Sequence, residues 1–178
     1  MNKALMPRKA REGRSFAAPL PDFETLDHAH QSALRMLESF NLLLVQLQDE
    51  GLGGPARASA QQILAFFNGP GRHHHDDEEE RVFPHLLASN DSELVAQVKC
   101  LQQDHHWLEE DWRELAPHVK AVAEGYNGYD LPMLTVALPV FDALYRDHIA
   151  LEETRVYPAA KRLQQALPPD QDGKNRPS

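Results

Sequence analysis

A short motif that combines histidine, glutamate, arginine and proline occurs twice in the chain. One copy runs from His74 to Pro84 and the other from His148 to Pro158; they share six identical positions, and one aromatic position is Phe in the first and Tyr in the second. In each copy a glutamate follows the histidine by four residues, a spacing that places both side chains on one face of an α-helix. Imidazole and carboxylate groups are metal ligands. Two such pairs that face each other could therefore hold metal.

Helical phase distinguishes the histidines that face the core. From His30, the positions +3, +4, +7, +10 and +14 are all apolar, whereas the early steps from His28 lead to Gln, Ser and Arg. His105 leads likewise to Leu, Trp, Leu and Val, and His148 lies in an apolar seam that also contains Glu152. We therefore expect His30, His105 and His148 to face inward, and His28 is the weaker candidate.

The helix that carries the first motif copy is ambiguous, because three consecutive histidines are followed by five consecutive acids. Alignment of the two copies selects His74 and Glu78 as the inward pair. His75 and Glu79 then become neighbours of the site or alternative ligands. Tyr145, three residues before the histidine of the second copy, could form a hydrogen bond near the centre.

Six inward groups thus come from four helices. The predicted metal ligands are His30, His74, Glu78, His105, His148 and Glu152. Burying two glutamates among imidazoles in an apolar bundle without a cation would cost several kcal/mol for each unpaired charge. The ligand types suit Fe, Mn or Zn. We therefore expect these residues to bind metal, and the residues alone leave iron, manganese and zinc open.

The elements that position these groups are expected to be helices. The chain has 178 residues, enough for one domain, and its apolar spacing is helical, with no convincing strand pattern. The fold class is all-α, an antiparallel up-down four-helix bundle at 21–166 between flexible tails at 1–20 and 167–178. Four helical stretches are expected: about 21–50; about 56–88, interrupted near 68–71; about 90–124, with a kink or early end at Pro117; and about 130–167.

Composition argues against several classes of protein. The net charge of −9 and the scarcity of clustered basic residues disfavour a nucleic acid or an anionic membrane as the partner. The single cysteine, Cys100, excludes an intrachain disulfide framework and a thiolate cluster, and it suits a reducing compartment. No apolar run approaches the roughly 20 residues of a membrane span, and the N-terminus lacks the apolar stretch of a secretory signal. We therefore expect a cytoplasmic protein; its oligomeric state is left open.

The doubled motif and the two further core histidines resemble the hemerythrin-like (HHE cation-binding) family over nearly all of the expected bundle. The resemblance implies a non-haem di-iron centre in which the four inward histidines are terminal ligands, while Glu78 and Glu152 bridge the irons. The oxygen carriers of the family use a His-x-x-x-His pair on the third helix, where this chain has His105 and Glu109, and an aspartate bridge. The chain is more similar to bacterial di-iron proteins linked to nitric oxide, oxidative stress and repair of iron-sulfur centres.

Three functions follow as hypotheses. The first is a di-iron protein that senses or scavenges O2, peroxide or nitric oxide, or that supplies iron for repair. The second is an enzyme with peroxidase or NO-reducing turnover at the same centre. The third is a storage or structural bundle stabilised by zinc or manganese.

Overall fold

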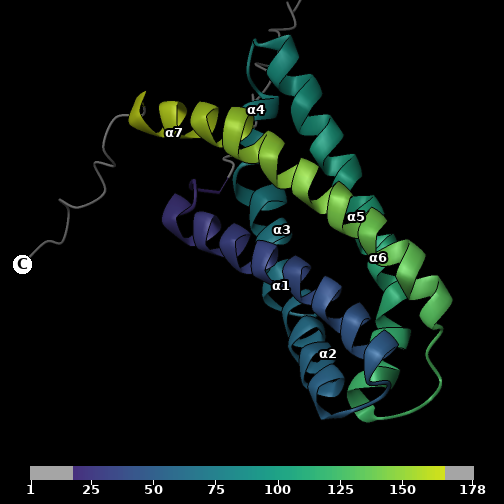
Figure 1. The fold of residues 1–178 in the computed structure, drawn as a ribbon. Coiled ribbons are helices and arrows are strands. Elements are labelled where there is room, and N and C mark those ends of the chain that lie inside the picture. Colours follow the sequence, from purple (N-terminus) through teal and green to yellow (C-terminus); the bar gives the residue numbers. More distant parts are fainter. Residues whose placement is uncertain (1–17, 167–178) are drawn as a thin grey trace, which may run out of the picture.

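Four helical stretches surround one another in the computed structural model, which describes residues 18–166 (Figure 1). The long helices are α1 (Phe23–Asp49), α2 (Gly54–Phe67), α5 (Ser92–Glu124) and α6 (Leu131–Leu151). The shorter elements are α3 (Pro70–Arg81), α4 (Phe83–Leu87), the π-helical turn η1 (Glu152–Val156) and α7 (Tyr157–Ala166). Helix α2 packs against α1 and α5, and α6 packs against the same two helices. No strand occurs in the described part of the chain, so the all-α prediction is confirmed, while the up-down direction stays a prediction.

Local sequence signals explain where the long helices begin and end. The Asp22 side chain accepts a hydrogen bond from the Glu24 N–H at 3.1 Å and caps α1. Gly125 ends α5 with φ of 80°, a left-handed conformation that glycine adopts without a steric penalty. Helix α5 continues through Pro117 to Glu124, so the early end considered from the sequence was wrong.

The second helical stretch is broken twice. The expected interruption near 68–71 lies between Phe67 and Pro70. A further break at Val82 separates α3 from α4, where the sequence predicted one continuous helix to about residue 88. Pro84 explains this break, because a proline removes a backbone donor and its ring clashes with the carbonyl four residues earlier.

The second motif copy has a matching irregularity. Pro158 has no N–H to donate to Thr154, and the chain forms a π turn in which the Tyr157 N–H donates to the Glu152 carbonyl, five residues back. In a regular α-helix, a side chain five positions on is rotated by about 140°. The π turn therefore returns Tyr157 to the side of the helix that carries Glu152.

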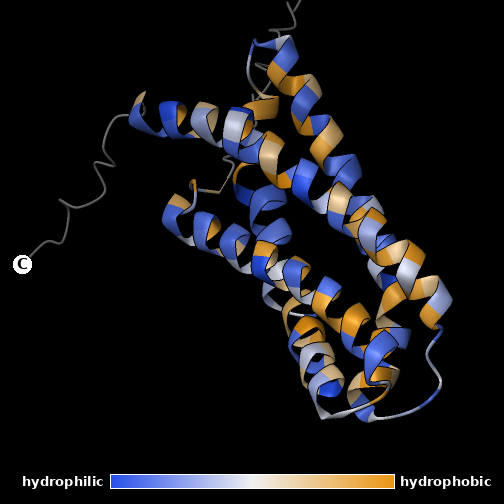
Figure 2. Ribbon diagram, in the orientation of Figure 1, coloured by the Kyte–Doolittle hydropathy of each residue, from blue (hydrophilic) through white to orange (hydrophobic). Residues whose placement is uncertain are grey.

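The core consists of two apolar clusters with a polar layer between them. The cluster at the bottom of Figure 1, called the lower cluster, is formed by α2, α6 and the C-terminal halves of α1 and α5. The upper cluster is formed by α4, α7 and the N-terminal parts of α1 and α5. On α1, His30 follows Leu26 of one cluster and precedes Ala33 of the other, and on α5, His105 lies between Leu101 and Leu108 in the same way. Helix α3, which passes through this layer, is almost wholly hydrophilic (Figure 2).

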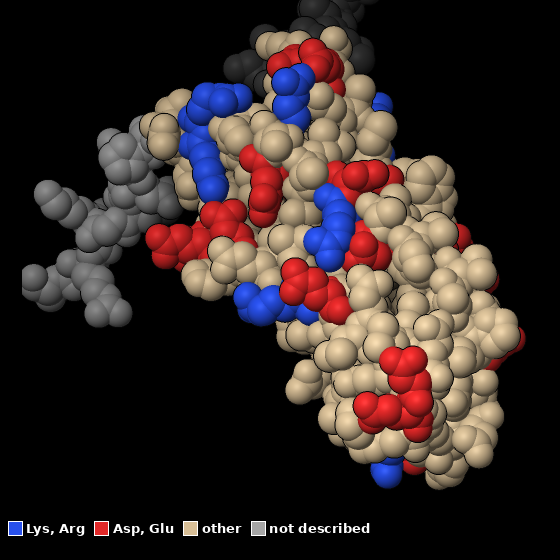
Figure 3. All heavy atoms as spheres, viewed as in Figure 1, with Lys and Arg blue, Asp and Glu red and all other residues tan. Residues whose placement is uncertain are grey.

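Charged side chains are unevenly distributed over the surface. Basic and acidic side chains are interspersed over the upper part of the face in Figure 3, whereas the region over the N-terminal half of α6 is largely uncharged. None of the described helices is long and apolar enough to cross a bilayer.

At the end of the expected N-terminal tail, the carbonyls of Ala18 and Pro19 accept hydrogen bonds from His85 and Arg81, so these residues pack on the bundle. The rest of both expected tails, 1–17 and 167–178, lies outside the described residues.

Candidate metal centre

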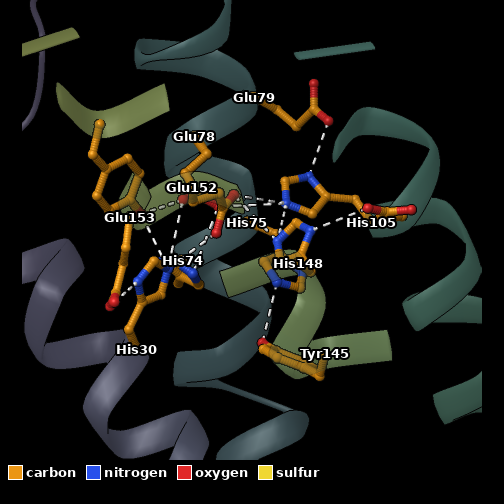
Figure 4. Close-up of polar contacts among 12 residues, drawn as sticks. His30, His74, His75, Glu78, Glu79, His105, Tyr145, His148, Glu152 and Glu153 are labelled. Carbon is orange, nitrogen blue, oxygen red and sulfur yellow. Dashed lines mark hydrogen bonds and ion pairs between the residues drawn. The ribbon is translucent and has the colours of Figure 1, made fainter. Parts of the chain in front are cut away.

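The six residues predicted to face inward come together in the polar layer (Figure 4). His30, Glu78 and Glu152 have 0% of their surface exposed. The remaining three are also buried: His148 at 1%, His74 at 4% and His105 at 7% exposure. Helical phase, together with the alignment of the two motif copies, thus identified buried positions on four separate helical stretches.

The tips of these side chains point at one another. Glu152 lies between two imidazoles, with Oε1 3.2 Å from the Nε2 of His148 and Oε2 3.1 Å from the Nε2 of His30. The Oε2 of Glu78 lies 3.4 Å from the Nε2 of His105 and 3.6 Å from that of His74. The Nε2 atoms of His105 and His148 are 3.2 Å apart.

Most of these polar atoms have no hydrogen-bond partner. Their distances are short, but the directions do not suit a hydrogen bond, and each atom is inaccessible to solvent. The buried atoms without a partner are both ring nitrogens of His74, Nδ1 of His148, Oε2 of Glu78 and both oxygens of Glu152. Buried polar groups almost always have a hydrogen-bond partner. A cluster of buried nitrogen and oxygen atoms without one therefore indicates that a binding partner completes the site. A cation accounts for them, because nitrogen and carboxylate oxygen are metal ligands.

Two overlapping sets of ligand atoms lie close enough to hold a metal ion. One set contains His30, His74, Glu78 and Glu152, and the other His75, Glu78, His105 and His148; within each set the ligand atoms lie within 4.8 Å of one another. Glu78 belongs to both sets, so its carboxylate lies within reach of both groups of imidazoles.

The charges within the layer are strongly perturbed. Burial lowers the pKa of His74 to about 3, so this ring is neutral. Burial would also lower the pKa of His148, but the adjacent Glu152 carboxylate outweighs it and raises the pKa to about 10. Burial, and then the charge of Glu152, raises the pKa of Glu78 to about 7. A cation that binds here would therefore displace protons, above all the proton of His148.

Outer carboxylates orient the imidazoles that come from α1 and α5. Glu153 Oε1 lies 3.1 Å from the Nδ1 of His30, and Glu79 Oε1 lies 3.0 Å from the Nδ1 of His105. A carboxylate at Nδ1 fixes the ring so that Nε2 faces the centre, an arrangement typical of metal-binding histidines. Each acid is the second glutamate of its motif copy, so each copy orients an imidazole from another helix.

The alternative candidates divide between the centre and the surface. His75 stacks on His105 with ring centroids 4.1 Å apart. The Tyr145 hydroxyl lies 3.1 Å from the Nε2 of His75. Glu79 supports His105, as described above. His28 is exposed and its Nδ1 lies 2.7 Å from the Glu24 carbonyl of the same helix, so it is not part of the centre.

Sequence reasoning missed three residues beside the centre. Glu153 occupies the motif position equivalent to Glu79, so the repeat itself carried a signal for it. Tyr157 lies five residues after Glu152, a spacing that helical phase does not associate with the same face. Asp104, whose Oδ2 lies 3.8 Å from the Nδ1 of His148, had no signal.

Metal affinity should rise with pH. His148 must lose its proton before Nε2 can bind a cation, and its raised pKa of about 10 means that the proton is present at neutral pH. The apparent affinity for Zn²⁺, a redox-inert probe, should increase by up to about tenfold per pH unit for each proton released, from about pH 6.5 toward pH 9. Competition with a chelator at fixed free zinc measures the affinity at each pH. A pH-independent affinity would contradict the release of a proton from His148.

Removing an outer carboxylate should weaken metal binding without removing a ligand. Glu153→Ala should lower zinc affinity about 10- to 100-fold, because the ring of His30 loses the group that orients it. Glu79→Ala should act similarly through His105. Glu80→Ala is the matched control, because this glutamate is exposed on the same motif. Equal affinities for the Glu153 and Glu80 variants would exclude the orienting role.

Comparison with known proteins gives one match. The family model described as the hemerythrin HHE cation binding domain matches residues 22–160. No curated protein and no solved structure matches the chain. The matched region spans α1 to α7 and contains every residue of the centre. The chain therefore belongs to the hemerythrin family, as a protein with an HHE cation-binding domain.

Proposed function

We propose that this chain is a non-haem di-iron protein that reacts with or senses O2, peroxide or nitric oxide, with a role in iron handling or repair. The observation that carries the proposal is the layer of buried donor atoms that have no hydrogen-bond partner. Five imidazoles and two carboxylates in two overlapping sets support two ions of a first-row metal. Iron would supply a change of oxidation state and an exchangeable coordination position.

A cavity connects the candidate centre with the surface. Its volume is about 760 Å³, and it lies between α2 and α3 on one side and α5 on the other. His75, His105 and Tyr145 line its inner end, and buried aromatic rings such as Phe67 and Trp112 line its floor. The lining also includes charged side chains such as Arg72, Glu109 and Lys120, and a cavity that combines apolar walls with polar groups is typical of a ligand site. A small molecule could therefore reach the His105 side of the centre without unfolding a helix.

Polar contacts cross this cavity between the helices. Arg72 on α3 pairs with Glu109 on α5 at 2.9 Å, and both side chains are more than half exposed. Gln102 Nε2 donates to Glu79 Oε2 at 2.7 Å nearer the centre. These links hold α3 against α5 while leaving the apolar floor beneath them. The buried residues around the centre exclude bulk water and position the side chains that line the inner end of the cavity.

A second function is favoured by the same cavity. Its volume exceeds what a diatomic molecule needs, and the Tyr145 hydroxyl and the His75 ring offer hydrogen bonds beside the candidate metal position. An enzyme that reduces peroxide or nitric oxide would use such groups to orient its substrate. Steady-state turnover with peroxide or nitric oxide supports the enzyme, whereas a single stoichiometric reaction supports the sensor or scavenger.

Iron loading tests the proposal directly. Anaerobic loading with ferrous iron should give two ions per chain, and exposure to O2 or nitric oxide should change the visible spectrum. His74→Ala and Glu152→Ala should lose metal and the stability that it adds, about 4 kcal/mol when free metal exceeds the Kd 1,000-fold. His28→Ala and Glu80→Ala are matched exposed controls that should keep both. Iron content equal in all four variants would refute the assigned ligands.

Narrowing the cavity should slow ligand entry without displacing metal. Asp76 is exposed and lines the cavity next to His75, so Asp76→Trp should reduce the bimolecular rate constant for nitric oxide several-fold. Glu80→Trp adds the same bulk to an exposed position of α3 that does not line the cavity. Stopped-flow spectroscopy measures the rates at matched iron content. Identical rates in the two variants would show that ligands enter elsewhere.

A further inference from the structure

The two motif copies build nearly the same surroundings for two different imidazoles. In the second copy, the Tyr157 ring stacks on His30, with ring centroids 5.1 Å apart and planes 5° from parallel. In the first, Phe83 stacks on His105 at 5.4 Å and 16°. Together with the matching glutamates at Nδ1, this gives each of the two rings an aromatic face and a carboxylate. The centre is therefore close to symmetric in its outer groups.

A hydroxyl group is one difference between the two copies. Tyr157 has a hydroxyl where Phe83 has none, and this hydroxyl is buried inside the layer. It donates a hydrogen bond to Oε1 of Glu78 and lies 3.2 Å from the Nε2 of His30.

The hydrogen bond divides the four carboxylate oxygens unequally. Three of them, Oε2 of Glu78 and both oxygens of Glu152, have no hydrogen-bond partner, and only Oε1 of Glu78 has one. The oxygens of Glu152 face opposite sides, one toward His148 and one toward His30. Glu152 is thus free to serve both metal positions, whereas Tyr157 occupies the oxygen of Glu78 that faces the His30 side.

We propose that Tyr157 makes the two metal positions inequivalent by holding Oε1 of Glu78, so that Glu152 is the principal bridging carboxylate and the His30-side ion is bound more weakly. This inference rests on the proposed two-ion centre. It departs from an equal bridging role for both glutamates, because a hydrogen bond to a carboxylate oxygen draws away electron density that the oxygen would otherwise donate to the cation.

The Tyr157→Phe variant tests the inference while keeping the aromatic ring. Stepwise zinc binding to the wild-type chain should give two dissociation constants, and the variant should bring them closer by about tenfold or more, the range for a hydrogen bond to a charged group. With ⁵⁷Fe(II), Mössbauer spectra of the wild type should show two distinct iron environments that become more alike in the variant. Equal melting temperatures of the metal-free proteins establish that the variant folds.

Two further variants separate this role from a general effect of a lost hydroxyl. Tyr129→Phe removes the hydroxyl of a partly buried tyrosine that lies outside the centre, and should leave the separation of the two constants unchanged. The swap Phe83→Tyr with Tyr157→Phe should restore the separation, because the hydroxyl then acts on the opposite side.

The outcomes are distinguishable. Two ions with constants unchanged in Tyr157→Phe, or an equal convergence in Tyr129→Phe, would overturn the role of Tyr157 and leave the di-metal centre intact. Binding of one ion per chain in the wild type would overturn the two-ion centre, and the inference would fail with it.

Discussion

The structure depends on a polar layer that is buried between two apolar clusters. Desolvating two carboxylates and several imidazoles is costly, and the clusters above and below the layer prevent water from satisfying them. Helix α3 shows the constraint most clearly, because a helix so hydrophilic has little apolar surface to drive its burial, yet His74 and Glu78 are buried. Bound cations would repay the desolvation, and metal binding and folding are then thermodynamically linked.

The two motif copies combine ligands with a controlled irregularity of the helix. A histidine and a glutamate four residues apart use regular α-helical spacing, and the proline that follows disturbs the spacing after them. The disturbance takes the form of a break at Val82 in one copy and of a π turn at residues 152–156 in the other. Both bring an aromatic ring onto an imidazole from another helix, so the proline belongs to the construction of the centre as much as the ligands do.

Sequence reasoning succeeded where the helices are regular. His30, His105 and His148 were placed by the apolar positions around them, because α-helical phase relates those positions to the core. In α3 there is no apolar stripe to set the phase, and the repeat was needed to choose His74. Tyr157 was missed because a π turn changes the angle per residue, which the pattern of apolar residues does not reveal. The burial of the predicted ligands is established, whereas their binding of metal stays a prediction.

The two sides of the centre differ in their access to solvent. The cavity is lined by His75, His105 and Tyr145, and among the described residues neither His30 nor Glu152 contributes to its walls. The Tyr157 hydroxyl lies on the His30 side. The cavity and the Glu78 oxygen that accepts the Tyr157 hydrogen bond therefore lie on opposite sides of the centre. An external ligand would meet the His105-side position first, while the enclosed His30-side position would affect the reaction through the shared carboxylates.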